Sequence, residues 1–121
     1  GNDLLLISHG NCLEQCFKAM SLIDDNISIS LINLPHIKPL DRNITNLINN
    51  FDKVLVIEDH KEFGSLFHRL KLLIFEYGLN SKIYGKNLKD NFFKPLRYKS
   101  ILEVEKFSPN DIKKLIMDIL K

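Results

Sequence analysis

The sequence predicts an α/β fold in three layers, in which a mostly parallel sheet of about four to five strands is covered by helices on both faces. Strand-like and helix-like patterns alternate at least three times with short connections, which is typical of parallel strands joined by helices. The run "VLVI" (Val54–Ile57) is apolar at every position and therefore needs cover on both faces. Because the 121 residues contain no linker, repeat or low-complexity segment, residues 1–121 are expected to form a single domain. Gly1 and Asn2 are set aside as a candidate cloning remnant.

A buried strand and an amphipathic helix are predicted at the start of the chain. Asp3–Ser8 is an apolar run too short for a helix, and a turn signal follows it. The next stretch has apolar residues at intervals of three and four, which predicts a helix that ends near the polar residues Asp24–Asn26. The apolar face predicted for this helix consists of Leu13, Cys16, Phe17, Met20 and Ile23.

A second strand and a second helix are predicted next. Ile27–Asn33 is rich in β-branched residues and alternates in polarity, which favours a strand. Pro35 and Pro39 cannot continue that strand, because each lacks an N–H donor and fixes its backbone. Asp41 is well placed to cap the following helix. The predicted apolar face of that helix consists of Ile44, Leu47, Ile48 and Phe51.

The middle of the chain predicts a third strand, a third helix and a fourth strand. Lys53–Asp59 is the clearest buried strand, and the loop His60–Gly64 follows it. The third helix is expected to stop at Gly78, because glycine readily adopts the left-handed conformation that ends helices. Its predicted apolar face consists of Leu66, Phe67, Leu70, Leu73, Ile74 and Tyr77. Ser81–Gly85 predicts a short fourth strand.

The last helix has a full start signal. Ser108 is predicted as its cap, Pro109 as its first residue, and Asp111 supplies an acidic group in its first turn. The predicted apolar face consists of Ile112, Leu115, Ile116, Ile119 and Leu120. Residues 86–107 give weak signals, and only "SILEVEKF" (residues 100–107) is predicted to be locally ordered, as a short helix or strand.

Composition and charge exclude several classes of protein. The net charge of +2 comes from intermixed basic and acidic residues, which argues against a nucleic-acid surface. No apolar run approaches the roughly 20 residues that span a bilayer, and no basic segment of a secretion signal precedes the first apolar run. We therefore expect a cytoplasmic domain that binds neither membrane nor nucleic acid.

The two cysteines lie four residues apart, on one face of the first predicted helix. That spacing raises the question of a metal or redox site at Cys12 and Cys16. A structural zinc site needs four ligands, and no second Cys or His pair has the usual spacing. Both cysteines are therefore predicted to be reduced and structural, and no metal site is predicted.

In parallel sheets the loops that leave the carboxyl ends of the strands carry the chemistry. The candidate loops here are Ser8–Asn11, Leu34–Leu40 and His60–Gly64. In the first loop, His9 and Gly10 precede a helix N-terminus, where anions are favoured. This turn resembles the phosphohistidine site of mannose-type phosphotransferase domains and the "HGS" turn of chelatase-like domains. A histidine with a purely structural role in the turn is the third interpretation.

The third loop offers a second candidate cluster. Glu58, Asp59 and His60 at the end of a buried strand are residue types suited to acid–base chemistry near neutral pH. The alternative is a strand whose acids hydrogen-bond neighbouring loop amides. A basic stretch lies further along the chain. It could bind an acidic or phosphate-bearing partner, or it could be a solvated connector. Its residues are Lys82, Lys86, Lys89, Lys94, Arg97 and Lys99.

Taken together, these elements resemble the C-terminal domain of transketolase-type, thiamine-diphosphate-dependent enzymes. In that family the second strand leads into a segment like "IKPLD", here Ile37–Asp41, and the third strand ends in an acidic pair, here Glu58, Asp59 and then His60. Gly64 matches the glycine-containing loop that follows, whereas Ser65 and Phe67 stand where the family commonly has glycine. The resemblance extends from Asp3 to the last helix.

The resemblance implies a parent enzyme that transfers two-carbon ketol units between sugar phosphates, or carries out a related 2-oxo acid reaction. Its relatives would be transketolases, deoxyxylulose-phosphate synthases and the β subunits of pyruvate-type dehydrogenases. Thiamine diphosphate and magnesium would be bound by preceding domains or a separate subunit, because the "GDG" motif for them is missing from this chain. This domain would support a homodimer and the active-site entrance and would hold no catalytic residue and no metal.

The same resemblance implies that His9 is a loop or interface residue and that the first-strand turn carries no phosphate. The implied interface or substrate-entrance residues are Ser8, His9, Gly10, Asn11, Glu58, Asp59, His60 and Gly64. The rival hypothesis is a free-standing phosphoryl carrier of the mannose-type phosphotransferase class that uses His9.

Overall fold

The computed structural model of this protein describes residues 2–34, 43–61, 64–88 and 106–121. Its sheet has four strands in the order β2-β1-β3-β4, and every neighbouring pair is parallel. The strands are β1 (Leu4–Ser8), β2 (Ile29–Asn33), β3 (Lys53–Lys61) and β4 (Lys82–Leu88). The expected parallel sheet is confirmed, and so is the interior position of the strand that contains "VLVI".

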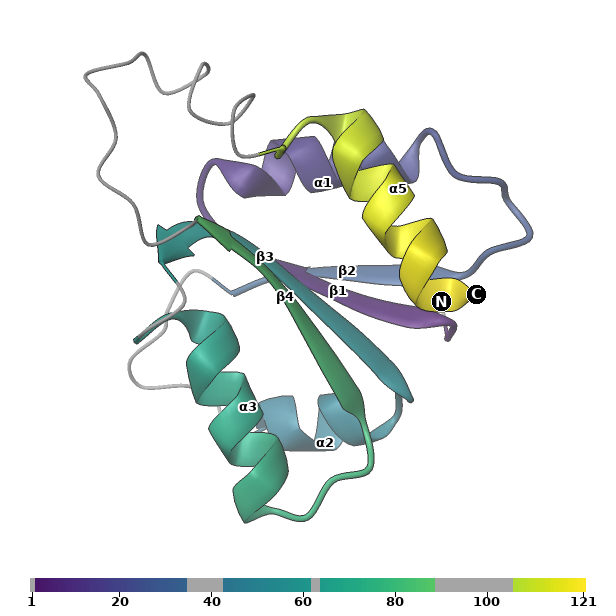
Figure 1. Cartoon of the computed structure of the whole chain (residues 1–121). Helices are drawn as coiled ribbons and strands as arrows, with labels where there is room; N and C mark the ends of the chain where they lie inside the picture. Colours follow the sequence, from purple (N-terminus) through teal and green to yellow (C-terminus); the bar gives the residue numbers. More distant parts are fainter. Residues whose placement is uncertain (1, 35–42, 62–63, 89–105) are drawn as a thin grey trace.

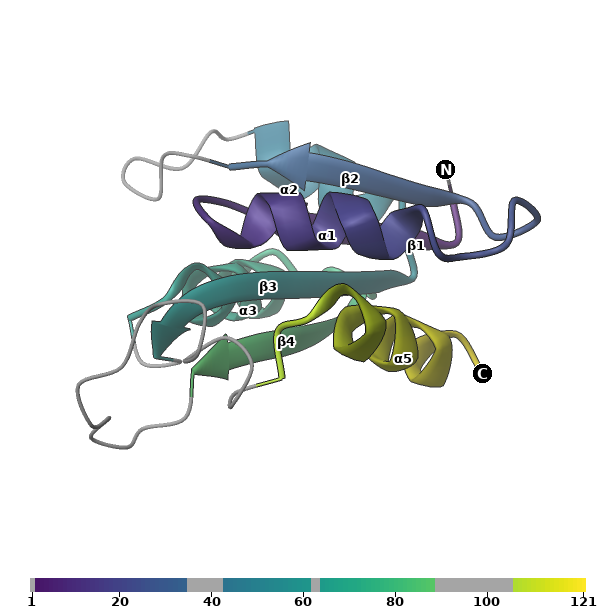
Figure 2. The same cartoon turned by 90° about the horizontal axis from the view of Figure 1, so that it is seen from above.

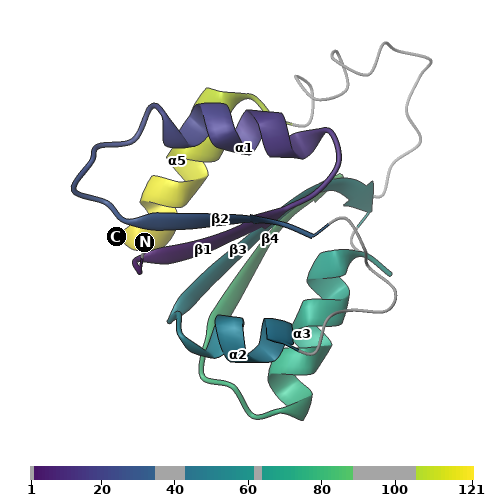
Figure 3. The same ribbon diagram turned by 180° about the vertical axis from the view of Figure 1, so that it is seen from behind.

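Helices cover both faces of this sheet (Figure 1, Figure 3). One face carries α1 (Cys12–Met20) and α5 (Pro109–Leu120), and the other carries α2 (Asn43–Asn49) and α3 (Leu66–Glu76). Alternate residues of the central strands point to opposite faces and form two cores. The core under α1 and α5 takes Leu4, Leu6, Leu55 and Ile57, and the core over α2 and α3 takes Leu5, Ile7, Val54 and Val56.

The helix ends follow the local signals in the sequence. Ser108 caps α5, since its Oγ accepts a hydrogen bond from the Asp111 amide at 3.2 Å. At the end of α3, Gly78 has φ +61°, in the left-handed region expected of the residue that stops this helix. Cys12 and Cys16 are free thiols and are buried on the core side of α1, as expected for structural cysteines.

Several predicted bounds and faces were wrong. Helix α1 ends at Met20 rather than near Asp24, and Phe17 is 66% exposed instead of lying on the buried face. The last apolar residue assigned to α3, Tyr77, is also exposed, because it lies at the cap beyond the last core contact. Strands β3 and β4 are longer than predicted and continue to Lys61 and Leu88.

Some predictions fall outside the described residues. These are the roles of Pro35, Pro39 and Asp41, most of the second candidate loop, and the order of "SILEVEKF" except at its end. There, Phe107 is fully buried in the core between the sheet and helices α1 and α5.

Strand β4 and helix α3 pack closely enough that one position requires glycine. A Cβ atom on Gly85 would lie 2.6 Å from the ring of Phe67, which is closer than non-bonded carbon atoms can approach. The Phe67 ring therefore occupies the space that a side chain at position 85 would fill. This contact helps to fix α3, and with it the site at its N-terminus, against the sheet.

Candidate functional site

The first candidate loop and the end of β3 meet at the carboxyl edge of the sheet. Strands β1 and β3 are parallel neighbours, with Ser8 opposite Ile57, so the first loop and the end of β3 lie side by side (Figure 2). The hydroxyl of Ser8 is fully buried and donates a 2.8 Å hydrogen bond to the Ile57 carbonyl. Ser8 therefore joins the two strand ends from inside the protein.

Glu58 is buried and serves as a cap for helix α3. Its two carboxylate oxygens accept hydrogen bonds from the amides of Leu66 and Phe67, at 3.1 and 2.9 Å. The Oγ of Ser65 accepts a third bond, from the amide of His68, at 3.2 Å. A carboxylate at a helix N-terminus is also stabilised by the helix dipole. The acid Glu58 at the end of β3 therefore does bond nearby backbone amides, but these amides belong to the first turn of α3 and not to the loop before it.

His9 is part of the same buried junction. The residue is 7% exposed, and its Nε2 lies 4.0 Å from Oε1 of Glu58. That separation is too long for a hydrogen bond but gives an electrostatic attraction whenever the imidazole is protonated. A phosphoryl carrier must present a ring nitrogen to its partner proteins, which this buried side chain does not do. His9 lies in the loop between β1 and α1, and its role at an interface or entrance stays a prediction.

The rest of the first turn faces solvent. Gly10 has φ +63° and is exposed, and its carbonyl accepts a 3.3 Å bond from the amide of Leu13. Asn11 is the exposed N-cap residue of α1, and its side chain makes no cap hydrogen bond. Beneath this turn, burial raises the pKa of the Cys16 thiol to about 11, against the opposing effect of its hydrogen bond to Ser8. At neutral pH Cys16 is thus a protonated thiol and a poor nucleophile.

The remaining predicted residues follow the buried part of β3. Asp59 is partly exposed, and the backbone of His60 lies in β3, whereas the side chain of His60 is outside the described part of the structure. Gly64 is exposed with φ +74°, and it turns the chain into the cap of α3. The candidate residues therefore divide into buried supports (Ser8, His9 and Glu58) and exposed positions (Gly10, Asn11 and Gly64, with Asp59 between the two groups).

An apolar hollow lies beside the first turn and was not predicted from the sequence. It has a volume of about 530 Å³ and lies between α1 and β2, where it is lined by Gly10, Leu13, Glu14, Phe17, Leu31 and Asn33. Its most exposed apolar side chain is Phe17, which the helical pattern assigns to the core. We call this surface the α1–β2 hollow.

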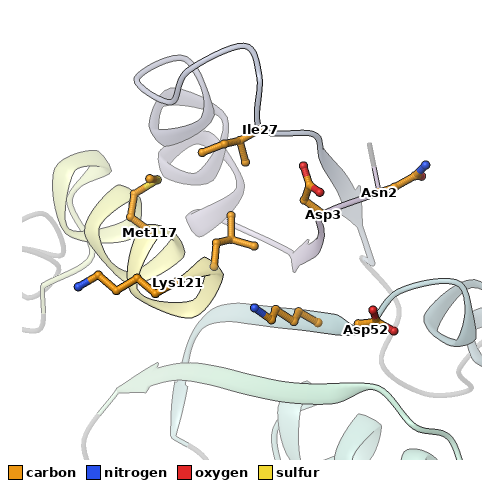
Figure 4. Close-up of a pocket in the computed structure, with 8 residues that line it drawn as sticks. Asn2, Asp3, Ile27, Asp52, Met117 and Lys121 are labelled. Carbon is orange, nitrogen blue, oxygen red and sulfur yellow. The ribbon is translucent and has the colours of Figure 1, made fainter.

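A second hollow lies at the opposite, amino edge of the sheet (Figure 4). It has a volume of about 510 Å³ and a mixed lining, which consists of Asn2, Asp3, Ile27, Asp52, Lys53, Met117, Leu120 and Lys121. The ammonium of Lys53 donates to the Ile119 carbonyl at 2.9 Å and so caps the end of α5. No predicted site residue lines this second hollow.

At the carboxyl edge, the donor groups of the described residues do not fit a magnesium diphosphate. Among the residues that the structure describes, no three His, Cys, Asp or Glu side chains come together to hold a metal ion. The buried carboxylate of Glu58, which is the best-placed acid, already accepts from two helix amides.

None of the helices in the described part of the chain has the length and hydrophobicity of a membrane-spanning segment.

Comparison with known proteins agrees with the family resemblance described for the sequence. The family model for "Transketolase, C-terminal domain" matches residues 1–112. The 1-deoxy-D-xylulose-5-phosphate synthase of Chlamydia trachomatis (serovar L2) is 26% identical over the whole chain, and its Chlamydia muridarum counterpart is 30% identical over 76% of the chain. The chain spans only 19% and 15% of the lengths of these two proteins.

The fold also has a close match among solved structures. A "split gene transketolase, inactive beta4 tetramer" superposes with a TM-score of 0.85 at 18% identity. The match covers 99% of this chain and 40% of the solved chain. At this level of identity the likeness concerns the fold alone.

Proposed function

Because the chain belongs to the transketolase C-terminal domain family, we propose that it is the non-catalytic C-terminal part of a transketolase-type transferase. The parent would transfer a two-carbon ketol unit, with thiamine diphosphate and magnesium held by its other domains or by a separate subunit. The names of the curated relatives favour a parent of the 1-deoxy-D-xylulose-5-phosphate synthase type. The cofactor supplies the carbanion chemistry when it is bound in the parent, and this chain contributes positioning.

The non-catalytic role is supported by one observation: the reactive side chains at the carboxyl edge of the sheet have structural roles. Glu58 caps α3, the Ser8 hydroxyl bonds the Ile57 carbonyl, and Cys16 is a buried thiol. Each group is thus committed to holding two strand ends and a helix together. The function left to the exposed positions around this junction is contact with a neighbouring domain.

We assign that contact to the exposed part of the first turn, the end of β3 and the α1–β2 hollow. An exposed aromatic residue beside an apolar hollow is typical of a surface that another protein segment covers. In the parent, Gly10, Asn11, Asp59 and Gly64 would border the entrance to the active site, together with His60. The preceding domains and the second subunit of a homodimer are the partners that this proposal requires.

Calorimetry and an activity assay test the proposal together. We expect thiamine diphosphate and magnesium to give no binding heat with the 121-residue chain. The natural full-length protein should bind both and form 1-deoxy-D-xylulose 5-phosphate. Micromolar binding of thiamine diphosphate by the isolated chain would mean that the cofactor site has been assigned to the wrong domain.

A phosphorylation assay tests the rival hypothesis. The chain is incubated with general phosphocarrier proteins and labelled phosphoenolpyruvate, and we expect no stoichiometric labelling because the His9 ring is buried. Labelling that disappears in a His9→Ala variant would overturn the transketolase-type assignment in favour of a phosphoryl carrier.

A further inference from the structure

We draw no further inference here: the strongest candidate, the outer edge of strand β2 beside the α1–β2 hollow, belongs to the domain contact already proposed, and pairing of a further strand with that edge is an established property of the family.

Discussion

At the scale of single residues, Glu58 connects three parts of the structure through one carboxylate. The residue lies at the end of β3, bonds the first amides of α3, and lies 4.0 Å from the ring of His9 in the first turn. A buried carboxylate is tolerated only when its oxygens are paired, and here two helix amides pair them. The position of α3 relative to the sheet therefore depends on this side chain.

We expect Glu58→Ala to destabilise the chain by about 2–4 kcal/mol, because one buried and one partly buried helix amide lose a charged acceptor. Glu58→Gln should cost less, since the amide oxygen still accepts one of the two bonds. Urea unfolding measures both free energies. Asp25→Ala, which removes an exposed acid from a loop, is the control and should stay within about 0.5 kcal/mol of the parent sequence. A loss below about 1 kcal/mol for Glu58→Ala would contradict the capping role.

The Cys16 thiol gives a second prediction, on the pH dependence of stability. Burial raises its pKa from 9.0 to about 11, so the folded state holds a proton that the unfolded state loses above pH 9. The stability from this thiol is complete below pH 9 and is lost between pH 9 and pH 11, by about 3 kcal/mol. The free energy of unfolding of the unsubstituted chain should therefore fall toward that of Cys16→Ala across this range. A constant difference between the two proteins from pH 8 to pH 11 would contradict the raised pKa.

At the scale of elements, α3 and β4 pack so closely that no room is left for a side chain at position 85. Gly85→Ala places a methyl group 2.6 Å from the Phe67 ring, which must then move, and we expect a loss of about 1–3 kcal/mol. In a Phe67→Leu background the same change should cost much less, because the smaller side chain leaves room for the methyl group. A double-mutant cycle from urea unfolding measures this coupling. Additive effects of the two substitutions would show that the ring is not the obstacle.

Helix α1 shows where a pattern of apolar residues is ambiguous. Its apolar residues form two stripes, Cys12, Cys16 and Ala19 on one side and Leu13, Phe17 and Met20 on the next. Spacing alone cannot tell which stripe faces the sheet, because both repeat at intervals of three and four. The smaller side chains form the buried stripe, since α1 packs against α5 as well as the sheet in the core that also holds Ile116. The larger side chain of Phe17 is left beside the α1–β2 hollow.

At the scale of the whole molecule, the sequence predicts the layers and strand directions well because these depend on long apolar patterns. The run at Val54–Ile57 could be satisfied only in the interior of a sheet covered on both sides, and the structure places it there. The candidate site was harder to predict, because the exposure of a turn residue depends on what packs over it. His9 and Glu58 are polar residues after strands, and only their tertiary neighbours make them buried supports.

The last prediction concerns the α1–β2 hollow in the full-length protein. Phe17→Gln should change the stability of the isolated chain by less than about 1 kcal/mol, because this side chain is 66% exposed. In the parent the same change should weaken contact with the neighbouring domain, since aromatic side chains in apolar hollows dominate such contacts and truncating one costs about 1–2 kcal/mol, roughly tenfold in affinity.

The expected signature of Phe17→Gln in the full-length protein is a lower kcat/KM with an unchanged thiamine diphosphate concentration for half-maximal activity. Leu22→Gln is the matched control, because Leu22 is 45% exposed just beyond the same helix and does not line the hollow. If Phe17→Gln instead raised the thiamine diphosphate concentration for half-maximal activity, the substitution would be acting on the cofactor-binding domains. An unchanged kcat/KM for Phe17→Gln would place the domain contact on another face of this chain.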